Sequence, residues 1–388
     1  MINVDTLKTA FAREYGASSL PVQYFFAPGR VNLIGEHIDY NGGHVFPAAL
    51  TLGIYGALRA RRDGLIVLKS TNAAPMVTVD LNKPIINTSS DGWGNYPKGV
   101  IKHLLDCGFA VKGCDILFSG NLPEGTGLSS SAALLVLTAF MLRTANGDRH
   151  IDRTELAKFC QKVENQFIGL NCGIMDQFSV VIGKRNCAVL LNCETLNYQY
   201  VPIVLKGYSL VIMNTNKKRE LADSKYNERR SECEQALHII QRYQPIDNLC
   251  QATLADVENY LADDVLRRRA RHVIAENNRV HAAVGLLEKG DIVGFARLVT
   301  ESHMSLKNDY EVTGHELDAI VASALKAPGC IGARMTGAGF GGCAIALTET
   351  AKLEEFKSVV AAEYKGRTGR TAAFYVAGIA DGVNKIAG

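Results

Sequence analysis

The sequence lacks the features that mark membrane, secreted or nucleic-acid-binding proteins. Its longest apolar run, residues 132–142, is interrupted by Thr138 and is too short to cross a bilayer. The net charge is only +3, so composition gives no electrostatic reason to expect a nucleic acid partner. The first residues include Asp5 and show no basic stretch followed by an apolar one, so we expect no secretory leader. We therefore expect neither a membrane nor a nucleic acid as partner.

Cysteines are present but lack the spacing of a metal or disulfide framework. Ten of them are scattered through the chain without a single C-x-x-C pair. In a chain of this length such a distribution is typical of reduced, mostly buried thiols. We predict a cytoplasmic protein without disulfides or a zinc site.

The length and composition favour a globular protein of two domains. The chain has 388 residues, of which 47% are hydrophobic and 21% charged, so it is long enough to bury sizeable cores. Periodicity predicts a mixture of helices and strands, with a boundary near residues 195–205 that separates domains at 1–200 and 201–388. The predicted strands are 25–33, 45–58, 66–70, 76–81, 115–119, 188–191, 208–213 and 343–347, and the predicted helices are 96–107, about 131–144, about 153–168 and most of 231–296.

Polar residues gather in a glycine-bounded segment at residues 29–43. Glu36 and Asp39 are hydrogen-bond acceptors, and His37 is either donor or acceptor. Short carboxylates on a rigid turn suit a sugar, whose hydroxyls each donate and accept. Asn41 and Gly42 predict a tight turn between the two flanking strands. The alternative is a solvated turn whose acids cap nearby amides.

A second glycine-rich segment, residues 123–131, follows a predicted strand and opens a helix. Gly125 and Gly127 allow close approach of a ligand, and Ser129 and Ser130 are good N-cap residues. Free amides and the positive end of the helix dipole make this a candidate phosphate site, and Ser131 could offer its hydroxyl to Mg²⁺. No Walker A motif occurs. The alternative is a structural turn with a serine cap.

Two acidic residues lie in apolar surroundings in the middle of the chain. Asp152 and Glu155 predict the start of a helix whose apolar face borders Glu164, and Asp176 lies among Ile174, Met175 and Phe178. A buried carboxylate needs a partner, which a metal ion or a basic side chain can supply. A purely structural ion pair or an amide cap is the alternative for both residues.

Two further sequence patterns give less information about function. Gly337, Gly339 and Gly342 satisfy G-x-G-x-x-G, but a predicted strand follows them in place of a helix, which excludes a dinucleotide-binding fold. A glycine-rich loop between strands can still close over phosphates or support an active site. A basic stretch at residues 267–271 lacks interleaved aromatic residues, and we expect it to be a solvated helix face.

The motifs together resemble those of the galactokinases in the GHMP small-molecule kinase family. Residues 29–41, 123–132 and 335–343 match three family motifs in order, and shorter matches lie at 163–167, 172–177 and 224–230. The resemblance covers nearly the whole chain. It implies an α+β fold of two domains, a ribosomal protein S5 domain 2-like N-terminal domain and a GHMP C-terminal domain, with the active site in the cleft between them.

The resemblance also implies a role for individual residues. The substrate would be bound by Glu36, His37, Asp39, Gly173 and Tyr226. The ATP phosphates would be bound by Gly125, Thr126, Gly127, Leu128, Ser129, Ser130 and Ser131. Mg²⁺ would be held by Ser131 and Glu164, and the catalytic residues would be Asp176, as base, and Arg30 beside it.

The implied activity is ATP-dependent phosphorylation of the anomeric hydroxyl of galactose to galactose 1-phosphate, the first committed step of galactose utilisation. A monomer is the expected state. Two alternatives stay open: a kinase for a related sugar such as N-acetylgalactosamine, and a non-catalytic regulator that binds sugar and ATP. One departure from the family is Ile38, where Thr is common. On an extended segment residue 38 would point away from its neighbours on either side, so we expect little effect.

Overall fold

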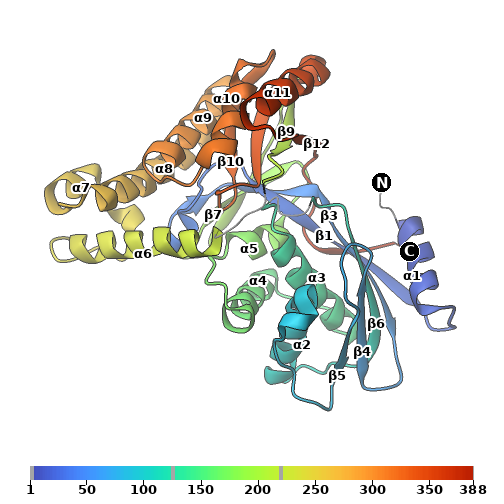
Figure 1. The fold of residues 1–388 in the computed structure, drawn as a ribbon. Coiled ribbons are helices and arrows are strands. Elements are labelled where there is room, and N and C mark those ends of the chain that lie inside the picture. Colours follow the sequence, from blue (N-terminus) through green and yellow to red (C-terminus); the bar gives the residue numbers. More distant parts are fainter. Residues whose placement is uncertain (1–3, 124–126, 218–221, 388) are drawn as a thin grey trace.

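The computed structural model describes residues 4–123, 127–217 and 222–387. Its helices and sheets form two large layered units that meet near the middle of the molecule (Figure 1). Most strand pairs are antiparallel, and helices are grouped on the faces of the sheets, so the expected α+β class is confirmed. Among the described residues, none of the helices combines the length and the apolar character needed to cross a bilayer.

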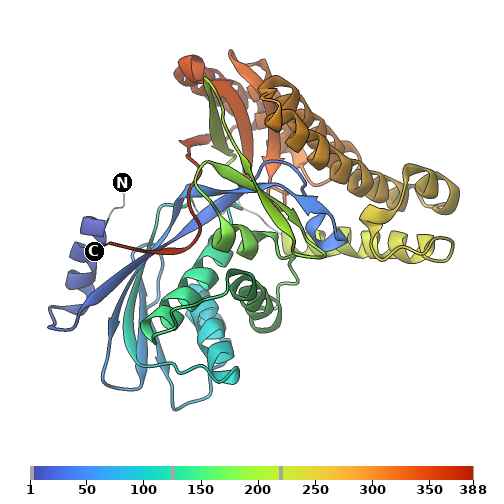
Figure 2. The same cartoon turned by 180° about the vertical axis from the view of Figure 1, so that it is seen from behind.

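The first unit is built on a six-stranded sheet of order β13-β1-β3-β6-β4-β5. Helices α2 to α5 cover one face, and α1 packs on the other (Figures 1 and 2). Alternate residues of β1 explain this arrangement, because Phe25 faces the main core and Tyr24 faces α1. The elements are α1 (Val4–Tyr15), β1 (Val22–Asn32), β3 (Pro47–Ala60), β4 (Leu65–Ser70), β5 (Val77–Asp80), α2 (Asn95–Asp106), β6 (Cys114–Gly120), α3 (Ser130–Ala145), α4 (Arg153–Val163), α5 (Met175–Ile182) and β13 (Asn384–Ile386).

The second unit contains a four-stranded antiparallel sheet of order β10-β11-β9-β12. Helices α9 to α11 pack against this sheet, and α8 lies on α9 and α6. The elements are β9 (Tyr208–Asn214), α6 (Ala222–Ile240), α7 (Leu254–Tyr260), α8 (Asp264–Glu288), α9 (Ile292–Asn308), α10 (Gly314–Lys326), β10 (Cys330–Thr336), β11 (Cys343–Glu349), α11 (Leu353–Thr368) and β12 (Ala373–Val376). A small sheet of β2 (His44–Val45), β7 (Cys187–Asn192) and β8 (Tyr198–Pro202) lies beside the two units.

Most expected elements are present, and one local prediction is wrong. The predicted tight turn is present as the 3₁₀ turn Asp39–Asn41, which ends at Gly42 with φ 74°, but it does not join β1 directly to β3, because the residues between Asn32 and Pro47 form a long excursion that also contains β2. The helix capped by Asp152 reaches Ile168 as predicted, with its last turn, Glu164–Ile168, in π-helical form. The basic stretch on α8 is not a uniformly solvated face, because Arg269 is only 2% exposed.

Candidate active site

A cavity of about 280 Å³ lies where the loop after β1, the start of α3, the α4–α5 connection, α6 and the β10–β11 loop meet. Five segments far apart in sequence therefore meet at one place. The expected site residues that line it are Arg30, Glu36, His37, Asp39, Gly127, Ser129, Ser130, Ser131, Glu164, Gly173, Asp176 and Tyr226. Leu128 is buried below the loop, and its carbonyl accepts a hydrogen bond from the Arg30 amide at 3.1 Å. Gly125 and Thr126 lie outside the described residues.

An ion pair crosses the middle of the cavity. The guanidinium of Arg30 lies 2.7 Å from an Asp176 carboxylate oxygen through Nη2, and Nε donates to the same oxygen at 2.8 Å. Its third nitrogen, Nη1, donates to the carbonyl of Gly127 at 2.5 Å. The Arg30 side chain is almost fully buried, whereas that of Asp176 is 30% exposed toward the cavity. One guanidinium thus joins the acidic residue to the glycine-rich loop.

The excursion after β1 is held by charged groups from the second unit. The buried carboxylate of Glu276 on α8 accepts hydrogen bonds from the Gly35 amide at 2.8 Å and from the Ser302 hydroxyl at 2.6 Å. Burial alone would raise the pKa of Glu276, but the nearby Arg279, together with other positive groups, lowers it to about 2. Glu36 in turn accepts from Arg334 Nη2 at 2.5 Å. These long-range partners carry no sequence pattern of their own.

Ile38 lies in the same excursion but not on an extended segment. Its backbone has φ −114° and ψ −4°, and its side chain is fully buried in the core. The expectation that it contributes little to the cavity stands, but the reason is burial and not strand alternation.

His37 has both ring nitrogens engaged within the protein. Nδ1 lies 2.9 Å from the Tyr40 hydroxyl, and Nε2 lies 3.2 Å from the carbonyl oxygen of Ala338. Burial, with a contribution from nearby His272, lowers the pKa of His37 to about 3, so the imidazole is neutral at ordinary pH. The ring therefore acts as a fixed wall of the cavity between the excursion and the β10–β11 loop.

Asp39 is the acidic residue with the most unfavourable surroundings. Burial raises its pKa to about 7, and the carboxylates of Asp176 and Glu36 add to the shift. The backbone of Gly173 lies directly against it, since a Cβ atom at position 173 would be 1.9 Å from Asp39 Oδ2. Glycine at this position is what allows the carboxyl group to face the cavity.

The raised pKa of Asp39 predicts a pH-dependent difference in stability between the parent and Asp39→Asn. Between pH 3.8, which equals the ordinary pKa of this group, and about pH 7, the Asp39 carboxyl holds a proton in the native state that it has released in the unfolded chain. The stability linked to this group is therefore lost as pH rises through that window. We expect the Tm of Asp39→Asn, taken relative to the Tm of the parent, to increase from pH 4 to pH 7 in sugar-free buffer.

Differential scanning calorimetry across this pH range measures the effect. Taking the difference between the two proteins cancels the buried His37, His272 and His303, whose lowered pKa values act in the opposite direction. A Tm difference that stays constant from pH 4 to pH 7 would contradict the prediction.

The glycine-rich loop enters α3 without an ordinary cap. Ser129 is the N-cap residue, but its φ is +61° and its hydroxyl makes no capping bond, so the alternative of a purely structural serine cap is not what the structure has. In the part of the chain that the structure describes, this buried hydroxyl has no hydrogen-bond partner. The first amides of α3 and an unused hydroxyl thus face the cavity, as a phosphate site requires.

A second cavity of about 280 Å³ adjoins the first and shares Ser130 and Ser131 with it. Aromatic and apolar side chains dominate its wall, among them Trp93, Tyr96, Phe118, Leu122 and Leu134. Such a slot next to a phosphate site suits a flat purine ring. Nothing in the sequence indicated this pocket, because its residues come from several separate elements and share no motif.

Glu164 and its neighbours form the group of oxygens that best suits a divalent cation. Burial raises the pKa of Glu164 to about 7, against the effect of a hydrogen bond from Ser131. Gln177 Nε2 donates to Glu164 Oε2 at 2.5 Å, and its own Oε1 is buried without a partner among the described residues. Gln177 was missed in the sequence because an amide next to Asp176 carries no distinctive pattern.

Among residues 4–123, 127–217 and 222–387, no group of three or more His, Cys, Asp or Glu side chains forms a metal cage. Mg²⁺ is usually held by one or two protein groups together with substrate phosphates and water. The carboxylate of Glu164, the hydroxyls of Ser131 and Ser129 and the free oxygen of Gln177 fit that manner of binding.

Family models match three parts of the chain. Residues 9–60 match the galactokinase galactose-binding signature, residues 95–184 the N-terminal domain of GHMP kinases, and residues 283–366 their C-terminal domain. The first match contains the excursion after β1, and the second contains the glycine-rich loop, Glu164 and Asp176.

Characterised relatives match over the full length. A galactokinase of Clostridium tetani is 52% identical over 388 residues, which cover 99% of this chain and 98% of the relative. A galactokinase of Clostridium beijerinckii is 47% identical, with 100% of both chains covered. The crystal structure of Lactococcus lactis galactokinase complexed with galactose superposes with a TM-score of 0.94 at 42% identity, covering 99% of this chain and 100% of that one.

Proposed function

Because the chain belongs to the galactokinases of the GHMP kinase family, we propose that it transfers the γ-phosphoryl group of ATP to the anomeric hydroxyl of galactose. The products are galactose 1-phosphate and ADP. The observation that carries the proposal is the Arg30–Asp176 pair, which lies between the polar excursion after β1 and the glycine-rich loop. An acceptor hydroxyl and a terminal phosphate would meet at that pair.

The sugar side of the cavity supplies fixed acceptors and a shaped wall. Glu36 and Asp39 offer carboxylate oxygens to sugar hydroxyls, and Gly173 leaves room for Asp39. His37 and Tyr226 lie with ring centroids 5.6 Å apart and close the opposite side. Buried groups that need sugar hydroxyls as partners reject ligands without them.

The phosphate side supplies positive charge and amide donors. Phosphoryl transfer has a loose transition state with negative charge on the equatorial oxygens, so positioning and neutralisation dominate its catalysis. Arg30 and the first amides of α3 are placed to provide both. Mg²⁺, held by Ser131 and Glu164 together with ATP, would supply further neutralisation.

Asp176 is the proposed base for the anomeric hydroxyl. A carboxylate is a weak base toward a sugar hydroxyl. The proton would therefore leave late, when the attacking oxygen is already bonding to phosphorus. The complete set of Arg30, Asp176, Glu164 and Ser131 supports turnover over a regulator that only binds sugar and ATP.

The test is ADP release with Mg-ATP against galactose, N-acetylgalactosamine, glucose, mevalonate and homoserine. We expect rapid ADP formation with galactose alone. Turnover with another member of the panel would change the proposed substrate but leave the proposed kinase activity in place. Saturable galactose binding without ADP formation from any of the five would overturn the enzymatic proposal.

Gly173→Ala should selectively impair galactose binding. The new methyl group would push the Asp39 carboxyl out of place, and a misplaced polar group of this kind costs about tenfold or more in galactose KM. The KM for ATP should stay within about twofold, because Gly173 lies on the sugar side. Gly366→Ala on α11, where nothing lies within 4 Å of the new atom, is the matched control. An unchanged galactose KM in Gly173→Ala would remove Gly173 and Asp39 from the sugar site.

We further propose a cytoplasmic monomer without nucleic acid or membrane partners, divided near residue 200. None of the ten cysteines forms a disulfide, which suits a reducing compartment. One chain supplies all of the groups that line the cavity, which supports a monomer.

A further inference from the structure

We propose that Arg269 is a positioning residue for the sugar wall: it clamps the turn at residues 309–313, and this turn positions the Tyr40 hydroxyl and the Ala338 carbonyl, which contact the two ring nitrogens of His37. The inference deepens the proposed function and rests on it for its kinetic readout. Arg269 itself belongs to a helix outside the cavity, and its hydrogen-bond partners among the described residues, Glu232, Asp309 and Glu311, do not line the cavity.

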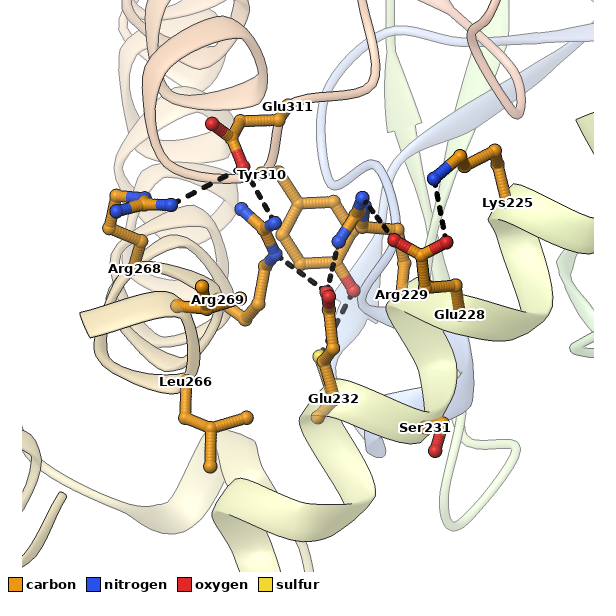
Figure 3. A network of polar contacts seen from close by, with 12 residues as sticks. Lys225, Glu228, Arg229, Ser231, Glu232, Leu266, Arg268, Arg269, Tyr310 and Glu311 are labelled. Atoms are coloured by element: carbon orange, nitrogen blue, oxygen red, sulfur yellow. Dashed lines mark hydrogen bonds and ion pairs between the residues drawn. The ribbon is translucent and has the colours of Figure 1, made fainter. Parts of the chain in front are cut away.

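Arg269 uses its guanidinium in three directions at once. Nε donates to Glu232 on α6 at 2.7 Å, and Nη2 donates to Glu311 at 2.7 Å (Figure 3). Nη1 donates to the carbonyl of Asp309 at 2.6 Å. The side chain is 2% exposed, so its charge is compensated almost entirely by these partners. A single planar group therefore ties α6, which carries Tyr226, to the turn between α9 and α10.

The turn needs such a clamp because one of its residues has an unfavourable backbone conformation. Glu311 has φ +57°, in the left-handed region that side chains other than glycine rarely adopt. The carboxylate of this same residue is the one that pairs with Arg269, and Arg268 adds a weaker contact at 3.4 Å (Figure 3). The ion pair thus acts directly on the strained position.

The first route from the turn to the cavity runs through two tyrosines. Tyr310 is fully buried, and its hydroxyl lies 2.8 Å from the Tyr40 hydroxyl and 3.0 Å from Cys233 Sγ. The Tyr40 hydroxyl lies in turn 2.9 Å from His37 Nδ1. A shift of the turn would therefore move the partner of one imidazole nitrogen.

The second route runs through the β10–β11 loop. The carbonyl of Val312 accepts a hydrogen bond from the Phe340 amide at 2.8 Å, and a Cβ atom on Gly339 would come within 2.2 Å of the same oxygen. This close contact fixes the loop that presents the Ala338 carbonyl to His37 Nε2 at 3.2 Å. The turn at residues 309–313 therefore positions the hydrogen-bond partners of both nitrogens of the His37 ring.

The chemistry of the partners fixes which group donates in each hydrogen bond of the series from His37 to Cys233. A carbonyl only accepts, so Nε2 of His37 carries the proton, and Nδ1 of the neutral ring must accept from the Tyr40 hydroxyl. The Tyr40 oxygen then accepts from Tyr310, whose oxygen accepts from the Cys233 thiol. The turn consequently sets both the tautomer and the orientation of the imidazole.

Three variants test the clamp. Arg269→Lys keeps the positive charge but cannot reach three acceptors, Glu311→Gln removes one charge from an exposed side chain, and Tyr310→Phe removes only the hydroxyl. We expect each to raise the galactose KM by about tenfold, with the KM for ATP within about twofold of the parent. Glu363→Gln is the control, because it breaks an exposed Arg–Glu contact of α11, with Arg367, outside the turn and the cavity.

The outcomes separate the clamp from simple structural damage. If Arg269→Lys fails to fold, Glu311→Gln and Tyr310→Phe still decide the question. Unchanged galactose KM values in both would overturn the proposal, as would equal losses for galactose and ATP. A readout that needs no substrate is ¹⁵N NMR of the histidine rings: we expect the Nε2–H tautomer for His37 and a changed Nδ1 signal in Tyr310→Phe.

An Nδ1–H tautomer for His37 in the parent would overturn the proposal as well. The NMR result stands even if the parent shows no galactose-dependent ADP release. Failure of the clamp and failure of the proposed function are therefore distinguishable.

Discussion

Asp176→Ala is expected to lower kcat by about 10²- to 10⁴-fold while the galactose KM changes by less than about threefold. The carboxylate is 30% exposed toward the cavity and is oriented by Arg30, so it is placed to receive a proton from bound substrate. Sugar binding should survive because Glu36, Asp39 and Tyr226 stay in place. Steady-state kinetics with saturating Mg-ATP measure the two parameters separately.

Asp176→Asn is the companion variant, because its amide oxygen can still accept from Arg30 but cannot take a proton at neutral pH. Loss of kcat in both variants supports a proton acceptor. A near-native kcat in Asp176→Ala would show that the base assignment is wrong. A large loss in the alanine variant alone would mean that the residue only orients Arg30.

Replacing Arg30 by methionine is the second large effect, with an expected fall in kcat of about 10²- to 10³-fold. The guanidinium is buried and divides its donors between Asp176 and the Gly127 carbonyl. Removing it takes away charge where the transferred phosphoryl group gains negative charge, and it also releases the glycine-rich loop. We expect a smaller rise in the KM for ATP, measured in the same kinetic experiment.

Arg30→Lys separates charge from geometry in this experiment. It keeps one positive charge but loses the planar fork that reaches both acceptors, so its kcat should fall between those of the parent and the methionine variant. Equal kcat values for the lysine and methionine variants would show that geometry alone matters. Native kcat in Arg30→Met would remove the residue from catalysis.

The parts of the site that could be predicted are those whose residues lie in short continuous segments of the sequence. Glu36, His37 and Asp39 lie within four residues of one another, and Asp176 follows Gly173 closely, so local pattern and family resemblance both find them. Their relative placement depends on the packing of α5 against β1, and periodicity predicted neither that contact nor α5 itself.

The partners that the sequence could not reveal are the long-range ones. Arg334 reaches Glu36 from a strand nearly 300 positions away, and Glu276 holds the backbone of the same loop from α8. A single buried charge on a helix or strand looks like any surface charge until its partner is known. Arg269 illustrates this: its neighbours in sequence suggested a solvated face, yet the structure buries it.

The pairing of β13 with β1 has a consequence for the order in which the chain can fold. The strand that carries Arg30 is made early on the ribosome, but the strand that pairs with its outer edge in the described structure is Asn384–Ile386, and Ile386 also packs beside α1. Until those residues emerge, β1 presents an open edge on which another chain could add. The first sheet can therefore close only when nearly all of the chain has been synthesised, and shortening the chain before residue 384 would leave that edge permanently open.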